Sequence, residues 1–129
     1  MPMMAQMSQP IIELPIDRVQ EAVDFAKAMN CPAEAAQVRF TASLLATNES
    51  KVVGVALAHE VGEDRIDLYV GFEASGGDLE LARQLANKAL HKIHGQGVHR
   101  CRIVPIGPAD CPEFWQQVNW LDHALAAGS

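Results

Sequence analysis

The sequence predicts a single α/β domain built around a mixed β-sheet, and three observations support this prediction. The chain has 129 residues, a length that can close one hydrophobic core without disulfides. Three strand-like stretches follow one another through short connections, which only antiparallel neighbours allow. A helix-like stretch then separates the last of these strands from one more strand, so these two strands should lie parallel.

The N-terminal part begins with a Met-rich segment, residues 1–9, for which we expect disorder. A β-branched run at 10–16 predicts the first strand. A helix is expected over 17–29, because apolar residues recur at helical spacing and the letters DRVQ at its start form a variant of the capping box. A second, shorter helix is expected over 33–41.

The rest of the chain predicts strands and helices in alternation. Residues 43–72 read as three strands separated by the turn-forming sequences NESK and GEDR. Helical spacing of apolar residues predicts a helix over 78–95, and residues 98–106 predict a strand. A last helix is expected over 110–121, because an Asp and a Glu three residues apart begin it. The complete order is β-α-α-β-β-β-α-β-α in one domain spanning 10–125.

Composition and charge exclude several classes of partner. The formal net charge of −6, without a basic stripe, argues against nucleic-acid binding. No apolar run is long enough for a membrane helix, and the first residues lack the pattern of a signal peptide. Three cysteines without a C-x-x-C spacing fit reduced thiols. We therefore expect a cytoplasmic protein that makes no contact with a membrane.

Histidines and a cysteine gather near the end of the helix expected over 78–95. These residues are His91, His94, His99 and Cys101. Their spacing does not match a zinc pattern. Histidines in the last turn of a helix also complement the helix dipole, which is a structural role. We therefore expect no metal site.

Two segments carry a resemblance to a known family. The stretch ATNESKVVGVALAHEVGEDRIDLYV, residues 46–70, resembles the central hairpin of the GNAT superfamily of acyl-CoA N-acyltransferases. The stretch RIVPIGPADCPEFWQQVNW, residues 102–120, resembles the family's fifth strand and the helix that follows it. The order of elements over 10–121 is similar too. The family's usual C-terminal hairpin is lacking, so we expect an exposed sheet edge near the last strand and a homodimer that covers it.

The resemblance implies transfer of an acyl group from acetyl-CoA, or another acyl-CoA, to an amine. The acceptor would be a small-molecule amine or an amine of a protein partner. In the family, the end of the fourth strand contacts the acyl-pantetheine arm, and the following loop and helix hold the pyrophosphate. The cofactor-binding residues implied here are Val70, Gly71, Phe72, Gly76, Gly77 and Arg83.

The loop after the fourth strand departs from the family pattern Q/R-x-x-G-x-G/A. Ser75, Asp78 and Glu80 stand at its three defining positions, so the CoA-binding loop is degenerate. Asp78 is well placed to cap the following helix, and the charge of Glu80 is favourable to the helix dipole. In the alternative interpretation, the acidic side chains of Asp78 and Glu80 stabilise the start of the helix themselves, and the loop binds no phosphate.

The candidates for a catalytic base surround the connection between the third and fourth strands, and they are Glu60, Asp67 and His59. Histidine is the residue type best suited to proton transfer near neutral pH. The tyrosine that acts as an acid in many family members is replaced by Trp115, whose indole is not a usable acid.

Three functions remain open at this point. The first is a reduced acyl-CoA-dependent N-acyltransferase. The second is a non-catalytic GNAT-fold module that binds or regulates a partner and has lost CoA binding. The third is an unrelated small α/β fold without acyl chemistry. A cleft between the fourth and fifth strands would favour the first function over the second.

Overall fold

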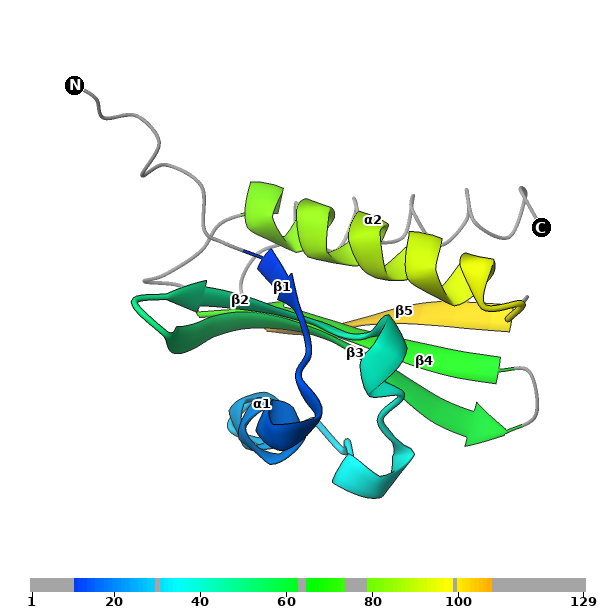
Figure 1. The fold of residues 1–129 in the computed structure, drawn as a ribbon, viewed down its shortest axis with the longest axis horizontal. Coiled ribbons are helices and arrows are strands. Elements are labelled where there is room, and N and C mark those ends of the chain that lie inside the picture. Colours follow the sequence, from blue (N-terminus) through cyan, green and yellow to red (C-terminus); the bar gives the residue numbers. More distant parts are fainter. Residues whose placement is uncertain (1–10, 30, 63–64, 74–78, 99, 108–129) are drawn as a thin grey trace.

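The computed structural model describes residues 11–29, 31–62, 65–73, 79–98 and 100–107. Figure 1 shows a twisted sheet with one helix on each face. The sheet contains five strands in the order β1-β2-β3-β4-β5, so strands that follow one another in the chain are also neighbours in the sheet. The strands are β1 (Ile11–Glu13), β2 (Leu44–Asn48), β3 (Lys51–Gly62), β4 (Arg65–Phe72) and β5 (Arg100–Gly107).

The directions of the strands match the predicted topology. β1, β2, β3 and β4 pair antiparallel in succession, whereas β4 and β5 pair parallel. The helix α2 (Leu79–Gly95) connects β4 to β5. The three consecutive strands predicted over 43–72 and the crossover helix that follows them are thus confirmed.

Each face of the sheet is buried by one helix (Figure 1). The helix α1 (Val19–Lys27) buries Ala22, Val23 and Ala26 against one face, which we call the α1 face. The apolar stripe of α2 lies against the other face, and its members are Leu81, Ala82, Leu85, Ala86, Ala89, Leu90 and Ile93. Apolar residues three and four positions apart explain why both segments are helical.

The N-terminal elements are shorter than predicted. β1 covers three residues, and a 3₁₀ turn (Ile16–Arg18) precedes α1. No side chain caps the start of α1, so the predicted capping box was wrong. The amide of Gln20 instead donates to Asp24 Oδ1 at 2.9 Å, one helical turn further on. Residues 1–9 lie outside the described residues.

The segment predicted as a second helix over 33–41 forms two 3₁₀ turns instead, Ala35–Gln37 and Phe40–Ala42. Val38 between them is extended and bridges to His59 of β3. The backbone N–H of Arg39 donates to the carbonyl of Ala58 at 2.8 Å. Pairing with the edge of β3 therefore overrides a weak helical pattern in this segment, and the β-branched Val38 favours the extended form.

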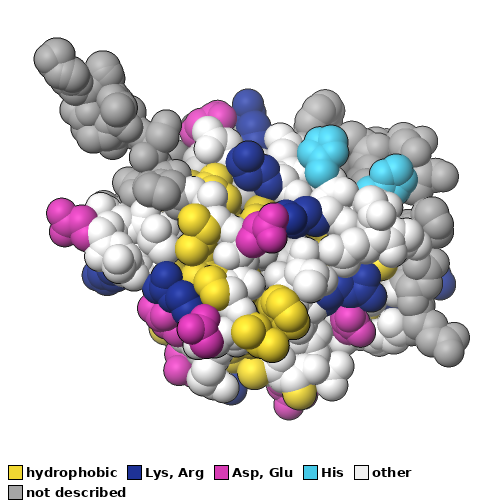
Figure 2. Space-filling view, viewed as in Figure 1, with side chains coloured by type: hydrophobic (Ala, Val, Ile, Leu, Met, Phe, Trp, Pro, Cys, Tyr) yellow, Lys and Arg dark blue, Asp and Glu magenta, His cyan; other side chains and the backbone are white. Residues whose placement is uncertain are grey.

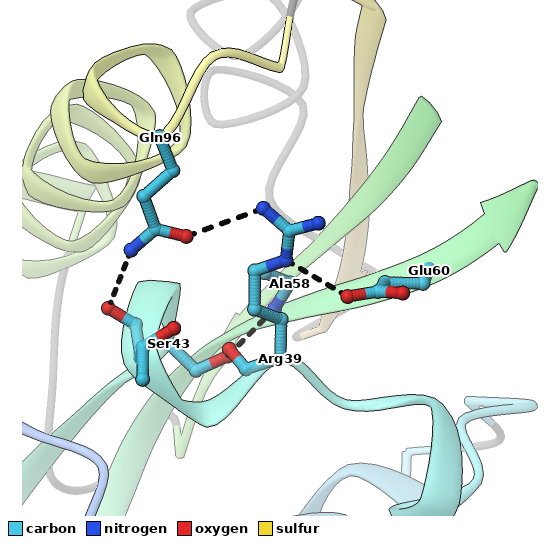
Figure 3. Close-up of polar contacts among 6 residues, drawn as sticks. Arg39, Ser43, Ala58, Glu60 and Gln96 are labelled. Carbon is cyan, nitrogen blue, oxygen red and sulfur yellow. Dashed lines mark hydrogen bonds and ion pairs between the residues drawn. The ribbon is translucent and has the colours of Figure 1, made fainter. Parts of the chain in front are cut away.

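A polar network fastens this segment to the rest of the molecule (Figure 3). The hydroxyl of Ser43 donates to the carbonyl of Arg39 at 2.8 Å and accepts the N–H of Ala58 at 2.9 Å. The guanidinium of Arg39 contacts Glu60 at 2.8 Å and Gln96 at 3.2 Å. The segment that leads into β2 is thereby tied to β3 and to the end of α2.

The last predicted helix, over 110–121, lies outside the described residues, and so does Trp115. No helix in the described part of the chain is both long and apolar enough to cross a membrane.

Candidate functional site

Polar side chains gather on the α1 face near the β3–β4 turn, where the rest of that face is apolar. His59 of β3 and Asp67 of β4 are directly paired residues in the antiparallel ladder. Asp67 is also paired with Arg102 of β5. Paired residues point to the same face of a sheet, so the three side chains form one row across three strands. Both His59 and Asp67 are buried, with 9% and 6% of their surface exposed.

The imidazole of His59 is oriented by the segment that covers it. Its Nε2 accepts the backbone N–H of Glu34 at 3.3 Å, and its ring lies 5.5 Å from the ring of Tyr69. A nitrogen that accepts a hydrogen bond carries no proton, so the neutral ring has its proton on Nδ1. Nδ1 is buried and has no hydrogen-bond partner among the described residues.

The carboxylate of Asp67 is only half satisfied. Its Oδ2 accepts Arg102 Nη2 at 3.1 Å, whereas Oδ1 is buried without a hydrogen-bond partner among the described residues. A buried polar atom without a partner costs free energy, of order 1–3 kcal/mol. The row therefore holds an unused donor on His59 beside an unused acceptor on Asp67, which is an arrangement found at sites that bind or react.

Glu60 does not join this row. It is paired with Ile66, which belongs to the core on the α2 side of the sheet. Its exposed carboxylate accepts Arg39 Nε at 2.8 Å, as Figure 3 shows. The structure thus brings His59 and Asp67 together and places the third predicted base in a surface ion pair.

Two further ionisable groups border the row on its apolar side. Burial raises the pKa of Tyr69, and the nearby Cys31 and Asp67 raise it further against an opposing effect of Arg102. Burial also raises the pKa of the Cys31 thiol, against a smaller effect of the Ala33 backbone hydrogen bond. Both groups therefore stay protonated near neutral pH, so Cys31 is a poor nucleophile.

The predicted contacts for an acyl-pantetheine arm lie further along β4. Parallel pairing with β5 continues from Arg65 to Val70, which faces Pro105. The register then breaks, and Gly71 faces Gly107. Ile106 is consequently an extra residue on β5, next to a proline that cannot donate a ladder hydrogen bond.

Side chains fill the space beside Gly71. A Cβ atom added there would lie 2.6 Å from Cγ1 of Ile106 and 3.1 Å from Sδ of Met29. β4 and β5 are paired as far as Gly71, with one irregularity after Val70. A group placed directly beside the Cα of Gly71 would have to displace Ile106.

The predicted pyrophosphate site falls largely outside the described residues. Ser75, Gly76, Gly77 and Asp78 belong to that part of the chain. Glu80 and Arg83 lie on the exposed side of α2 and form an ion pair of 3.8 Å with each other. The cation predicted to help hold a pyrophosphate thus has an anion beside it.

No group of three or more histidine, cysteine or acidic side chains that could hold a metal ion occurs within the described ranges. His99 is not among the described residues, and His91 and His94 are exposed on the last turns of α2.

Sequence reasoning missed three arginines on the same face of the sheet. Arg102 contacts Asp67, and Arg65 is paired with Arg100 in the next row. The signal available in the sequence was the alternation of Arg100, Arg102 and the apolar residues between and after them, which places both arginines on one face of a strand.

The chain has a five-stranded sheet with the β4-α2-β5 crossover and one helix on each face. This is the fold of the GNAT N-acetyltransferases, to which the structure is similar. A GNAT-family acetyltransferase from Staphylococcus aureus Mu50 superposes with a TM-score of 0.57 at 14% identity, over 88% of this chain and 79% of that one. The ribosomal-protein-S18-alanine N-acetyltransferase of Escherichia coli gives 0.57 at 14% identity, over 86% and 76%.

A third structure contains the coenzyme. The PaiA N-acetyltransferase of Thermoplasma acidophilum, in complex with coenzyme A, superposes with a TM-score of 0.54 at 12% identity, over 87% of both chains. No protein-family model matches the sequence, and no curated protein matches it significantly. The likeness at these identities concerns the fold.

Proposed function

We propose that the protein is an acyl-CoA-dependent N-acyltransferase that transfers an acyl group to an amine. Support comes from its fold, which several N-acetyltransferases share, and from one observation on this chain. That observation is the buried Asp67 carboxylate, which has one oxygen without a described partner beside a hydrogen-bond donor of His59.

The chemistry needs a group that removes a proton from the attacking amine. Asp67 Oδ1 can accept that proton, because Arg102 occupies only the other oxygen. His59 is less suited to this role, since the Glu34 N–H occupies the nitrogen that would have to accept it. His59 Nδ1–H instead serves as a donor that positions the acceptor or the carboxylate. Because Oδ1 is buried in this structure, an amine reaches it only after a neighbouring group moves.

The end of β4 offers backbone groups to an acyl donor, but two side chains would have to move to admit it. The register break after Val70 leaves backbone groups next to a residue without a side chain, where an acyl-pantetheine arm can approach closely. Ile106 and Met29 occupy that space and would have to withdraw. Acyl-CoA would supply the activated thioester carbonyl, and the backbone of Val70, Gly71 and Phe72 would hold the arm.

Calorimetric titration with acetyl-CoA, followed by detection of released thiol in a panel of amines, tests this proposal. We expect binding in the micromolar range. Asp67→Asn should lower kcat by about 10²–10⁴-fold while the acetyl-CoA affinity and the melting temperature stay unchanged. Asp24→Asn is the matched control, because Asp24 is an exposed aspartate on α1 whose side chain forms a hydrogen bond only with Gln20 among the described residues. Equal activity of the two variants would rule out Asp67 as the base.

A second candidate function is a GNAT-fold binding or regulatory module without turnover. The pairing of β4 with β5, which extends to Gly71 despite the irregularity after Val70, favours it, together with the acid Glu80 in the first turn of α2. Ile106→Ala separates the two functions. If acetyl-CoA binds neither the wild type nor this variant at millimolar concentration, the module without CoA is the correct description and the search turns to protein partners.

A further inference from the structure

Two arginines face each other at the beginning of the β4–β5 ladder. Arg65 and Arg100 are directly paired, and alternation along each strand places them on the α1 face with Asp67 and Arg102. Both side chains are exposed. Like charges directly opposite each other in a sheet destabilise it, so this pair needs a compensating reason.

The other basic residues of the chain show how unusual this pair is. Lys and Arg total 10, and six of them form ion pairs: Arg18, Arg39, Lys51, Arg83, Lys92 and Arg102. Figure 2 shows acidic and basic side chains interspersed over the visible face. Four cations lack an ion pair among the described residues, and two of these are the facing Arg65 and Arg100.

The position of the pair relates it to the candidate site. Residues two apart on one strand face are separated by about 6–7 Å, so the arginine pair lies one row from Asp67 and His59. Guanidinium groups bind carboxylates through paired N–H donors. The arginine pair thus offers a cationic subsite one row from the Asp67 carboxylate, which is itself paired with Arg102. Glu63 and Asp64, which precede Arg65 in the chain, are not among the described residues.

We propose that Arg65 and Arg100 bind a carboxylate of the acceptor, and that the acceptor is therefore a small amine carrying a carboxylate several ångströms from its nitrogen, as in an acidic amino acid. Its amine would point to Asp67 and its distal carboxylate to the arginine pair. That the amine of this ligand is acylated rests on the proposed acyltransferase function. The anion subsite itself rests only on the arginines.

Calorimetry at low salt with L-glutamate and L-glutamine tests the subsite without an acyl donor. The two probes differ in the charge of the distal group. We expect the wild type to bind glutamate at least about tenfold more tightly than glutamine, because a charge-assisted pair is lost with the amide. Arg65→Gln with Arg100→Gln should abolish this preference. Lys27→Gln with Lys88→Gln removes the same charge from two exposed helical cations that form no ion pair among the described residues, and it should preserve the preference.

The possible results separate this proposal from the proposed function. Equal binding of both probes, no binding of either, or a preference that survives in the double-arginine variant would overturn the anion subsite. A preference for glutamate without any acyl transfer would retain the subsite and refute the acyltransferase. The melting temperature of the double-arginine variant should equal or exceed that of the wild type, since a like-charge contact is removed.

Discussion

Ser43 is a fully buried hydroxyl that joins the segment before β2 to β3 (Figure 3). It is the hydrogen-bond partner of the Ala58 N–H and also donates to the carbonyl of Arg39. Ser43→Ala should lower the free energy of unfolding by about 1–3 kcal/mol, because a buried N–H is left without a partner. Urea unfolding measures this change. The exposed neighbour Thr41 provides the control, and a loss as large in Thr41→Ala would contradict the explanation.

Sequence reasoning named His59 and Asp67 as candidate bases, but it did not reveal which of their polar atoms have hydrogen-bond partners. Alternation along a strand predicts that Asp67 shares a face with Tyr69, and this holds because strand periodicity is local. The free nitrogen of His59 and the free oxygen of Asp67 depend on partners that lie 25 and 35 residues away. Such partners are fixed by tertiary structure, so a single sequence does not reveal them.

At the scale of elements, Gly71 near the end of β4 leaves less space for a side chain than the other described glycines. Gly71→Ala should lower the free energy of unfolding by about 1–3 kcal/mol, because its Cβ would lie 2.6 Å from Ile106 Cγ1, which is not the flexible end of that side chain. Gly62→Ala is the control, since an added Cβ there meets nothing within 4 Å. Chemical denaturation of both variants should show the larger loss for Gly71→Ala, and a reversed order would disprove this account.

The strands over 43–72 were predicted more accurately than the short helix over 33–41, because their apolar patterns are stronger. β3 and β4 are nearly continuous apolar runs that are buried on both faces, and α2 has apolar residues at helical spacing. Both patterns are strong because burial of these residues stabilises the sheet and the helix. Residues 33–41 have a weak period, and their backbone finds partners on β3 at Ala58 and His59. Long-range pairing of this kind cannot be read from spacing within the segment.

For the molecule as a whole, the buried Cys31 and Tyr69 predict a loss of stability at alkaline pH. Burial raises both pKa values above the ordinary 9.0 and 10.0. Above about pH 9 the unfolded chain loses protons that the folded chain retains, so the free energy of unfolding falls as the pH rises. Urea unfolding of the reduced protein between pH 7.5 and 10.5 should show this decline. Cys31→Ala with Tyr69→Phe should flatten it, and an equally steep decline in that variant would refute the assignment.

The sheet order, in which each strand lies beside its neighbour in the chain, has a consequence for how the molecule folds. The β2–β3 and β3–β4 contacts close only short turns, whereas the β1–β2 contact spans α1 and the β4–β5 contact must await the crossover through α2. The entropy of loop closure is therefore small for the first contacts and larger for the last. The β2–β3–β4 meander can assemble first as a template, and the row that contains Arg102 is completed only when β5 docks. The candidate site is thus among the last parts of the protein to form and among the first to be lost when the edge of the sheet opens.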